Sequence, residues 1–190
     1  MMHEPIRWVE SLFDDWARRM SPVMLQAIHF YQRDEGAAEL NAWYRRGIRP
    51  IDIDEVRTVS DLLDHALSEV KFDSDIVVYR GVGQRDRERF PDAVMEALAG
   101  AGGVVEDRGY LSTSLDRSVS ISEFATDRGT VYEIHVPAGQ YCGYLGHPLV
   151  SRPERLYQAE VLFPRGSLMV IRSVEYRRNG VARWITMELQ

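Results

Sequence analysis

The amino-acid sequence predicts an α+β fold, in which an N-terminal helical block packs on a core of two mainly antiparallel β-sheets. Apolar residues recur at three- and four-residue steps through the first third of the chain, as on one face of a helix. From residue 75 onward, short β-branched runs follow one another. Helical segments do not alternate strictly with these runs, as they would in a doubly wound parallel sheet.

The helical block is expected to contain a series of helices with recognisable ends. Ser21 followed by Pro22 predicts a helix start, because serine caps free N–H groups and proline fits the first helical position. Gly47 predicts the end of the helix before it, because glycine readily adopts the left-handed conformation there. The expected helices cover residues 6–20, 23–34, 37–46 and 56–70.

The β-rich part is expected to begin near residue 73, and the whole chain, residues 1–190, is expected to form one domain with a helical part at 1–72. One further helix is expected over residues 90–100. Asn179-Gly180 predicts a hairpin turn. The expected strands cover residues 75–82, 109–115, 130–136, 156–163, 167–176 and 181–189.

Composition argues against several classes of protein. The net charge of -6 argues against a general electrostatic grip on nucleic acid or anionic membrane. Cys142 is the only cysteine, so no internal disulfide forms, and the five histidines show no metal-ligand spacing with it. The first residues do not resemble a secretory signal, and no apolar run reaches the roughly 20 residues that span a bilayer. We therefore expect a soluble protein without a metal site.

Polar side chains stand at the ends of three expected strands. Arg80 closes one strand, Ser112 lies in a Ser-Thr-Ser strand, and Gln158 and Glu160 open a third on one face, since they are two residues apart. A guanidinium suits a diphosphate, a hydroxyl can position a sugar, and a carboxylate can stabilise positive charge at a sugar carbon. Each residue alone is more often an ion-pair partner, a turn or a solvated strand face.

The order and context of these motifs carry more information. VVYRG, GYLSTS and QAEVLFPRG follow one another in the chain. This series resembles the signature of mono-ADP-ribosyltransferases of the Arg-Ser-Glu class, the exoenzyme-type bacterial ADP-ribosylating toxins, in their Gln-x-Glu variant. The resemblance covers residues 20–190 and implies the ADP-ribosyltransferase fold.

The resemblance implies that the protein uses NAD as co-substrate, transfers its ADP-ribose and releases nicotinamide. Arg80 would hold an NAD phosphate or ribose, and the backbone of Gly81 would lie against the nicotinamide amide. Ser112 would fix the nicotinamide ribose and orient Glu160. Glu160 would accept a hydrogen bond from a ribose hydroxyl and stabilise the oxocarbenium-like transition state.

Two weaker matches add candidate NAD contacts. Asn41 and Arg45 lie four residues apart, hence on one helix face, and the resemblance implies that they reach NAD; an exposed polar helix face is the alternative. Phe124 and Arg128 match the family's loop over the phosphates and nicotinamide, with one extra residue in this chain. An ordinary loop is the alternative for these two.

The position of Gln158 would face the acceptor. Family members that modify arginine have a glutamate there, whereas a neutral amide suits a non-arginine acceptor, either a protein amide side chain or a nucleic-acid base. Arg155 stands where similar enzymes have an aromatic residue that contacts the target, so it is a candidate for acceptor recognition. Tyr157 is expected to point to the opposite strand face and into the core.

The resemblance thus indicates a toxin or effector that modifies a macromolecular acceptor: a host or competitor protein, or nucleic acid. It would be secreted or delivered to act in a target-cell cytoplasm without binding membrane, and an immunity protein or antitoxin could accompany it. Two alternatives stay open, an NAD glycohydrolase, in which water replaces the acceptor, and a catalytically silent module of the same fold that binds a partner protein.

Overall fold

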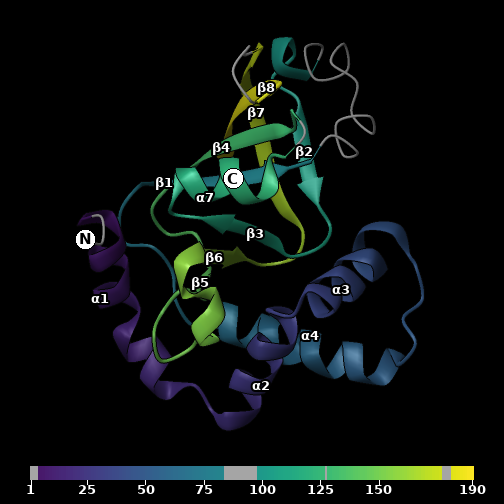
Figure 1. Ribbon diagram of the computed structural model, residues 1–190, viewed down its shortest axis with the longest axis vertical. Coiled ribbons are helices and arrows are strands. Elements are labelled where there is room, and N and C mark those ends of the chain that lie inside the picture. The colour runs from purple at the N-terminus through teal and green to yellow at the C-terminus, as the bar shows by residue number, and fades with distance from the viewer. Residues whose placement is uncertain (1–3, 84–97, 127, 177–180) are drawn as a thin grey trace. The chain divides into compact units, whose positions relative to one another are not determined.

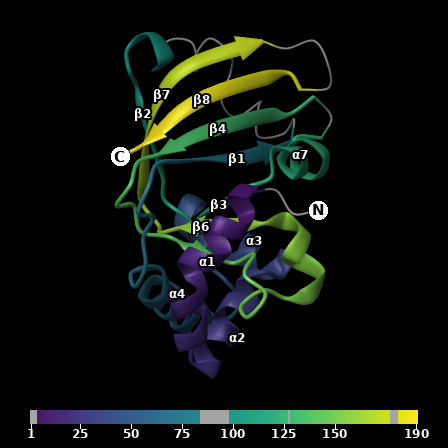
Figure 2. The same ribbon diagram turned by 90° about the vertical axis from the view of Figure 1, so that its left-hand side faces the viewer.

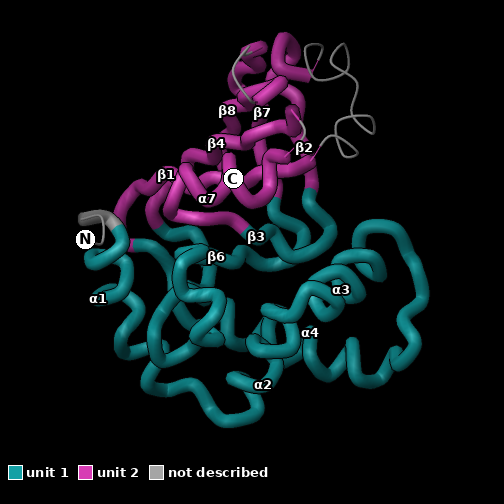
Figure 3. Tube along the Cα trace, in the orientation of Figure 1, with its two compact units in different colours: residues 1–72, 107–112, 139–167 teal, residues 73–106, 113–138, 168–190 magenta. Residues whose placement is uncertain are grey.

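The computed structural model describes residues 4–83, 98–126, 128–176 and 181–190. The chain forms two compact units, which are described separately (Figure 3). Unit 1 comprises Met1–Phe72, Asp107–Ser112 and Gly139–Ser167; unit 2 comprises Asp73–Glu106, Thr113–Ala138 and Leu168–Gln190. That residues 1–190 form a single domain stays a prediction.

Unit 1 contains the four N-terminal helices and a short β-hairpin (Figure 1). Ser21 caps the second helix by accepting a hydrogen bond from the Met24 N–H at 3.3 Å, and Gly47 ends the third with a φ of 68°. These two signals were predicted and are confirmed. The elements are α1 (Glu4–Arg19), α2 (Pro22–Tyr31), α3 (Asp34–Arg46), α4 (Ile53–Leu67), β5 (Gly143–Tyr144), η2 (Pro153–Gln158) and β6 (Glu160–Phe163).

The core of unit 1 is built around Phe13. Its ring lies 5.7 Å from that of Trp16 on the same helix, 5.6 Å from Phe72 and 6.1 Å from Tyr144 on β5, all edge to face. Such pairs add to the stabilisation that apolar burial provides. The apolar face of α1 therefore packs against segments more than fifty residues away in the chain.

Four of the other strands, β7, β8, β4 and β1, lie side by side with a marked twist (Figure 2). β1 pairs with β4 antiparallel, from Ile76↔Val136 to Val82↔Thr130, whereas β4 and β8 are parallel. The elements are β1 (Ile76–Val82), β2 (Val104–Asp107), β3 (Leu111–Ser114), α7 (Arg117–Val119), η1 (Ser120–Phe124), β4 (Thr130–Val136), β7 (Ser167–Tyr176) and β8 (Arg183–Leu189).

The α+β class is confirmed, but the expectation of two separate sheets is wrong. The strands follow a single hydrogen-bonded order, β2-β7-β8-β4-β1-β3-β6-β5. The reason is that β3 has a neighbour on each side: Ser114 pairs with Tyr79 of β1, while β6 follows β3 on its other edge. The pairs β1–β3, β1–β4, β5–β6 and β7–β8 are antiparallel, as expected, whereas β4–β8 is parallel.

Some of the expected features fall wholly or partly on residues that the structure does not describe. Of the helix expected over residues 90–100, residues 98–100 are helical and the others lie outside the described residues, as does the Asn179-Gly180 turn. Among the described helices, none combines the length and the apolar character needed to cross a bilayer.

Candidate active site

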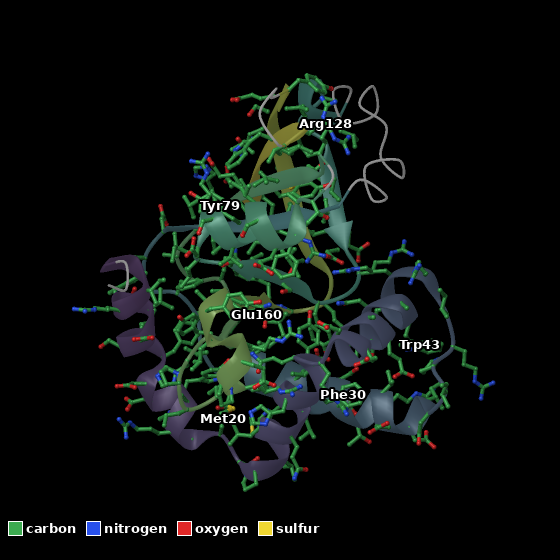
Figure 4. All side chains as sticks on the ribbon, viewed as in Figure 1. Met20, Phe30, Trp43, Tyr79, Arg128 and Glu160 are labelled. Atoms are coloured by element: carbon green, nitrogen blue, oxygen red, sulfur yellow. The ribbon has the colours of Figure 1, made fainter. Side chains whose placement is uncertain are left out.

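The centre of the candidate site in unit 1 is a hydrogen bond between Ser112 and Glu160. The Ser112 hydroxyl on β3 donates to Oε1 of Glu160, the first residue of β6, at 2.6 Å. This distance is in the range of a charge-assisted O–H···O⁻ bond. Glu160 is only 7% exposed (labelled in Figure 4), so its carboxylate is held in a fixed direction with little water around it. The structure thus brings these two residues together, and their roles toward NAD stay a prediction.

Tyr110 fixes the chain just before Ser112. Its backbone N–H donates to Asn41 Oδ1 at 2.8 Å, and its hydroxyl lies 2.8 Å from Asp64 Oδ1 and 3.0 Å from the Ser60 carbonyl oxygen. Burial, reinforced by the negative charge of Asp64, raises the pKa of the Tyr110 phenol. β3 therefore starts from an anchored, neutral tyrosine.

Asn41 and Arg45 do face the same side of α3, as their spacing predicted. Both are partly buried against the segment before β3, so the alternative of an exposed polar helix face does not hold. Arg45 binds the Asp107 carboxylate at 2.7 and 2.8 Å and the Tyr110 carbonyl oxygen at 2.8 Å. A Cβ on Gly109 would lie 2.3 Å from Asn41 Oδ1, so a larger residue there would displace the Asn41 side chain. Their role toward NAD stays a prediction.

Gln158 and Glu160 do not stand side by side on one strand, as had been expected. Gln158 is the last residue of the 3₁₀ helix η2, and Ala159 has left-handed φ and ψ angles of 44° and 46°. The strand begins only at Glu160, so the rule that alternate residues share a face does not apply. Tyr157 is 54% exposed, and its hydroxyl accepts a hydrogen bond from Gln158 Nε2 at 3.3 Å; its expected burial is wrong.

Arg155, the candidate for acceptor recognition, also lies on η2. Its Nη2 donates to Asp34 Oδ1 at 2.8 Å, and the neighbouring Arg152 pairs with Glu154 at 2.5 Å. Both loop arginines are thus engaged by carboxylates. The positive charge of these two side chains is therefore largely neutralised.

In unit 2, Arg80 and Gly81 are consecutive residues of β1. A Cβ on Gly81 would lie 2.0 Å from the Ser120 carbonyl oxygen and 2.8 Å from Cβ of Phe124, because η1 packs directly on β1 at this point. Only glycine allows this approach. The π-helical geometry of η1 is itself uncommon and is frequently found at functional sites.

The two loop candidates of unit 2 follow from η1. Phe124 closes η1 and is 43% exposed. Arg128 (labelled in Figure 4) has a φ of 60°, a backbone conformation that costs a residue with a side chain on the order of 1–3 kcal/mol. The adjacent Gly129 is required, since a Cβ there would lie 2.1 Å from the Val82 carbonyl oxygen.

The structure thus joins Ser112 to Glu160 in unit 1 and Gly81 to Phe124 in unit 2. Sequence reasoning missed Gln32 and His29, which hold the loop before Glu160, because a polar residue at a helix end has no periodic signature. In the described part of the chain, no group of three His, Cys, Asp or Glu side chains is arranged to hold a metal ion. A pocket of about 430 Å³ in unit 1 is lined by none of the expected site residues.

Comparisons with known proteins place these motifs in a family. The model of the family described as ADP-ribosyltransferase exoenzyme matches residues 6–189. Comparison with curated proteins finds no match.

Solved structures share the fold. Plx2a, an ADP-ribosyltransferase toxin from Paenibacillus larvae, is 23% identical, with a TM-score of 0.77 over 97% of this chain and 94% of that one. The C3 exoenzyme of Clostridium limosum is 23% identical, with a TM-score of 0.76 over 98% and 94%. C3stau2 from S. aureus, solved with NAD, is 18% identical, with a TM-score of 0.76 over 97% and 93%. The chain therefore belongs to the ADP-ribosyltransferase exoenzyme family, the Arg-Ser-Glu class that its motifs resemble, and is an NAD-dependent ADP-ribosyltransferase.

Proposed function

We propose that this chain transfers ADP-ribose from NAD to a non-arginine acceptor on a macromolecule and releases nicotinamide. The observation that carries the proposal is the 2.6 Å hydrogen bond between Ser112 and Glu160. It holds a nearly buried carboxylate in one orientation, which is what electrostatic stabilisation of a developing cation requires.

The reaction breaks the bond between the nicotinamide ring nitrogen and ribose C1′. Both bonding electrons leave with nicotinamide, and the ribose becomes oxocarbenium-like. Glu160 accepts a hydrogen bond from a ribose hydroxyl and stabilises this positive charge, while Ser112 fixes the carboxylate. An acceptor nitrogen then bonds to C1′ and loses its proton.

Residues other than Ser112 and Glu160 are further candidates for NAD contacts. Arg80 has a guanidinium suited to a phosphate or ribose, and the bare backbone at Gly81 offers a surface against which a flat amide can lie. Phe124, with its exposed ring, and Arg128, in its strained loop, complete the contacts of unit 2. Asn41 and Arg45, which bind the Tyr110 backbone within unit 1, are the other two candidates.

In the proposed transfer, the acceptor contacts the side chain of Gln158. A neutral amide both donates and accepts hydrogen bonds and matches an acceptor that is itself neutral, either a protein amide side chain or a nucleic-acid base. The Gln158 amide itself offers no counter-charge to a cationic guanidinium. The exposed Tyr157 and the ion-paired Arg155 flank this position. We further propose that the protein is delivered as an effector into the cytoplasm of a target cell.

The test uses NAD labelled on its adenosine together with extracts of animal and bacterial cells. Label that becomes macromolecular and is then released by protease or by nuclease identifies the acceptor class. Nicotinamide release with all label left as free ADP-ribose instead establishes an NAD glycohydrolase, which needs the same Ser112–Glu160 pair. No nicotinamide release with any extract contradicts the proposal and favours the silent binding module.

The acceptor assignment has its own test in the variant Gln158→Glu. The introduced carboxylate can hold and deprotonate a guanidinium, so we expect ADP-ribosylation of agmatine to appear while the original transfer falls. Agmatine modification is measured by chromatography of the labelled product. Unchanged acceptor preference in this variant would show that Gln158 does not face the acceptor.

A further inference from the structure

The segment between β5 and β6 is a closed loop, residues 146–158, that begins and ends beside Glu160. The backbone N–H of Gly146 donates to the Glu160 carbonyl oxygen at 3.1 Å, which ties the two ends together. Near its start, His147 is almost fully buried and lies with Nε2 3.0 Å from Asp14 Oδ1. The geometry of this loop therefore bears directly on Gln158, its last residue.

The side chain of Gln32 holds the middle of the loop. Gln32 follows the last residue of α2 and is 5% exposed. Its Nε2 donates to the Leu145 carbonyl oxygen at 3.2 Å and to Ser151 Oγ at 3.4 Å, while its Oε1 accepts from the Arg152 N–H at 2.9 Å. One buried amide thus satisfies backbone groups at both sides of the loop, more than a hundred residues away in the chain.

Two neighbours of Gln32 extend this contact along the loop. His29, one turn earlier on α2, has Nε2 3.0 Å from the Val150 carbonyl oxygen. Asp34, at the start of α3, binds Arg155 at 2.8 Å. These two contacts are partly or fully exposed, so water can replace them at little cost, whereas the buried contacts of Gln32 have no such substitute.

We propose that Gln32 is a positioning residue for acceptor transfer: it fixes the loop of residues 146–158 and thereby the orientation of Gln158. This inference rests on the proposed function. Glu160 does not depend on Gln32, because β6 is held by its pairing with β5 and the Glu160 carboxylate by Ser112. Loss of Gln32 should therefore impair transfer to a large acceptor and spare the reaction with water, which needs no acceptor position.

The experiment compares Gln32→Ala with Gln26→Ala, a control of the same residue type on α2 whose side chain is exposed. Two rates are measured for each protein. The first is nicotinamide release without an acceptor, and the second is transfer of label to macromolecules in an extract that the wild-type protein labels. In Gln32→Ala we expect hydrolysis to stay within about twofold and transfer to fall by about tenfold or more, since small misplacements of reacting groups are that costly. The control should change neither rate. An equal fall of both rates, or unchanged transfer, would overturn the proposal.

Limited trypsin digestion tests the loop without relying on activity. Trypsin cleaves after Arg155, before Leu156, but not at the Arg152-Pro153 bond. We expect cleavage at Arg155 to be about tenfold faster in Gln32→Ala than in the wild type, because local opening controls access. Equal cleavage contradicts the proposal. If the wild type releases nicotinamide but labels no macromolecule, the proposed transfer fails, while this digestion still decides whether Gln32 fixes the loop.

A third variant, Gln32→Glu, separates positioning from a general loss of stability. As a carboxylate, the introduced group accepts from the Arg152 N–H but faces the Leu145 carbonyl oxygen without a proton to donate. Burial raises the pKa of such a carboxyl, and below that pKa it donates again. The ratio of transfer to hydrolysis in Gln32→Glu should therefore recover toward the wild-type value as pH falls, and in Gln32→Ala it should not. A flat ratio in both variants would count against a positioning role.

Discussion

Replacing Glu160 is the most direct test of how this protein would cleave NAD. Glu160→Gln keeps the length and the hydrogen-bonding capacity of the side chain but removes its charge. Glu160→Asp keeps the charge but draws the carboxylate back by about one carbon–carbon bond, roughly 1.5 Å. The Ser112–Glu160 contact of 2.6 Å would then open to about 4 Å, beyond hydrogen-bonding distance.

The expected magnitude follows from the geometry of this pair. Loss of one preorganised group that stabilises transition-state charge costs about 2.7–4 kcal/mol, so Glu160→Gln should release nicotinamide about 10²–10³ times more slowly. Ser112→Ala removes a hydrogen bond to a charged group worth about 1.5–3 kcal/mol, or about 10–150-fold in rate. Because both changes act on one unit, the double variant should be little slower than Glu160→Gln alone.

The assay is nicotinamide release from NAD labelled on the pyridine ring, with thermal unfolding followed on the same samples. The Glu160→Gln and Ser112→Ala proteins should melt cooperatively, within a few degrees of the wild type, because the surrounding packing is unchanged. Wild-type turnover in Glu160→Gln would refute the electrostatic role of Glu160. Additive losses in the double variant would refute the coupling through the 2.6 Å hydrogen bond.

Two further predictions concern stability. Gly81→Ala brings a Cβ to 2.0 Å from the Ser120 carbonyl oxygen and should lower the free energy of unfolding by about 1–3 kcal/mol or more. The loss is measured as a lower urea midpoint. An unchanged midpoint would show that η1 can move away from β1 without cost. The raised pKa of Tyr110 means that the folded protein keeps this phenol protonated where the unfolded chain ionises it. Its contribution to stability is fully present below about pH 10 and is lost as pH rises above that value, at a rate of about 1.4 kcal/mol per pH unit. In Tyr110→Phe the urea midpoint should be lower at pH 7, since Asp64 and Ser60 lose a partner, yet fall less steeply above pH 10; an equally steep fall would contradict this reasoning.

Local patterns explain why much of the fold could be predicted. The expected strands at residues 130–136 and 167–176 coincide with β4 and β7, because β-branched runs and their flanking turn residues are visible in a short window. The start of α2 at Pro22 follows from its serine cap in the same way. The single strand order could not be predicted, since it depends on which edges of β3 pair with segments far away in the chain.

The segment before Glu160 shows where a local pattern misleads. Its apolar letters are typical of a strand, yet Pro153–Gln158 forms a 3₁₀ helix and Tyr157 lies at the surface. A tertiary contact acts just before this segment, because Gln32 binds Ser151 and Arg152 from more than a hundred residues away in the chain. No spacing within the segment itself records that contact.

By itself, the sequence determined the α+β class, the ends of several helices and strands, and the order of Arg80, Ser112 and Glu160 that identifies the family. Only the tertiary structure decided that Ser112 and Glu160, forty-eight residues apart, share a hydrogen bond, and that Gln32 supports the loop before Gln158. The physical reason is that helix caps and strand periodicity depend on neighbouring residues. A bond between distant side chains depends on how the whole of unit 1 packs.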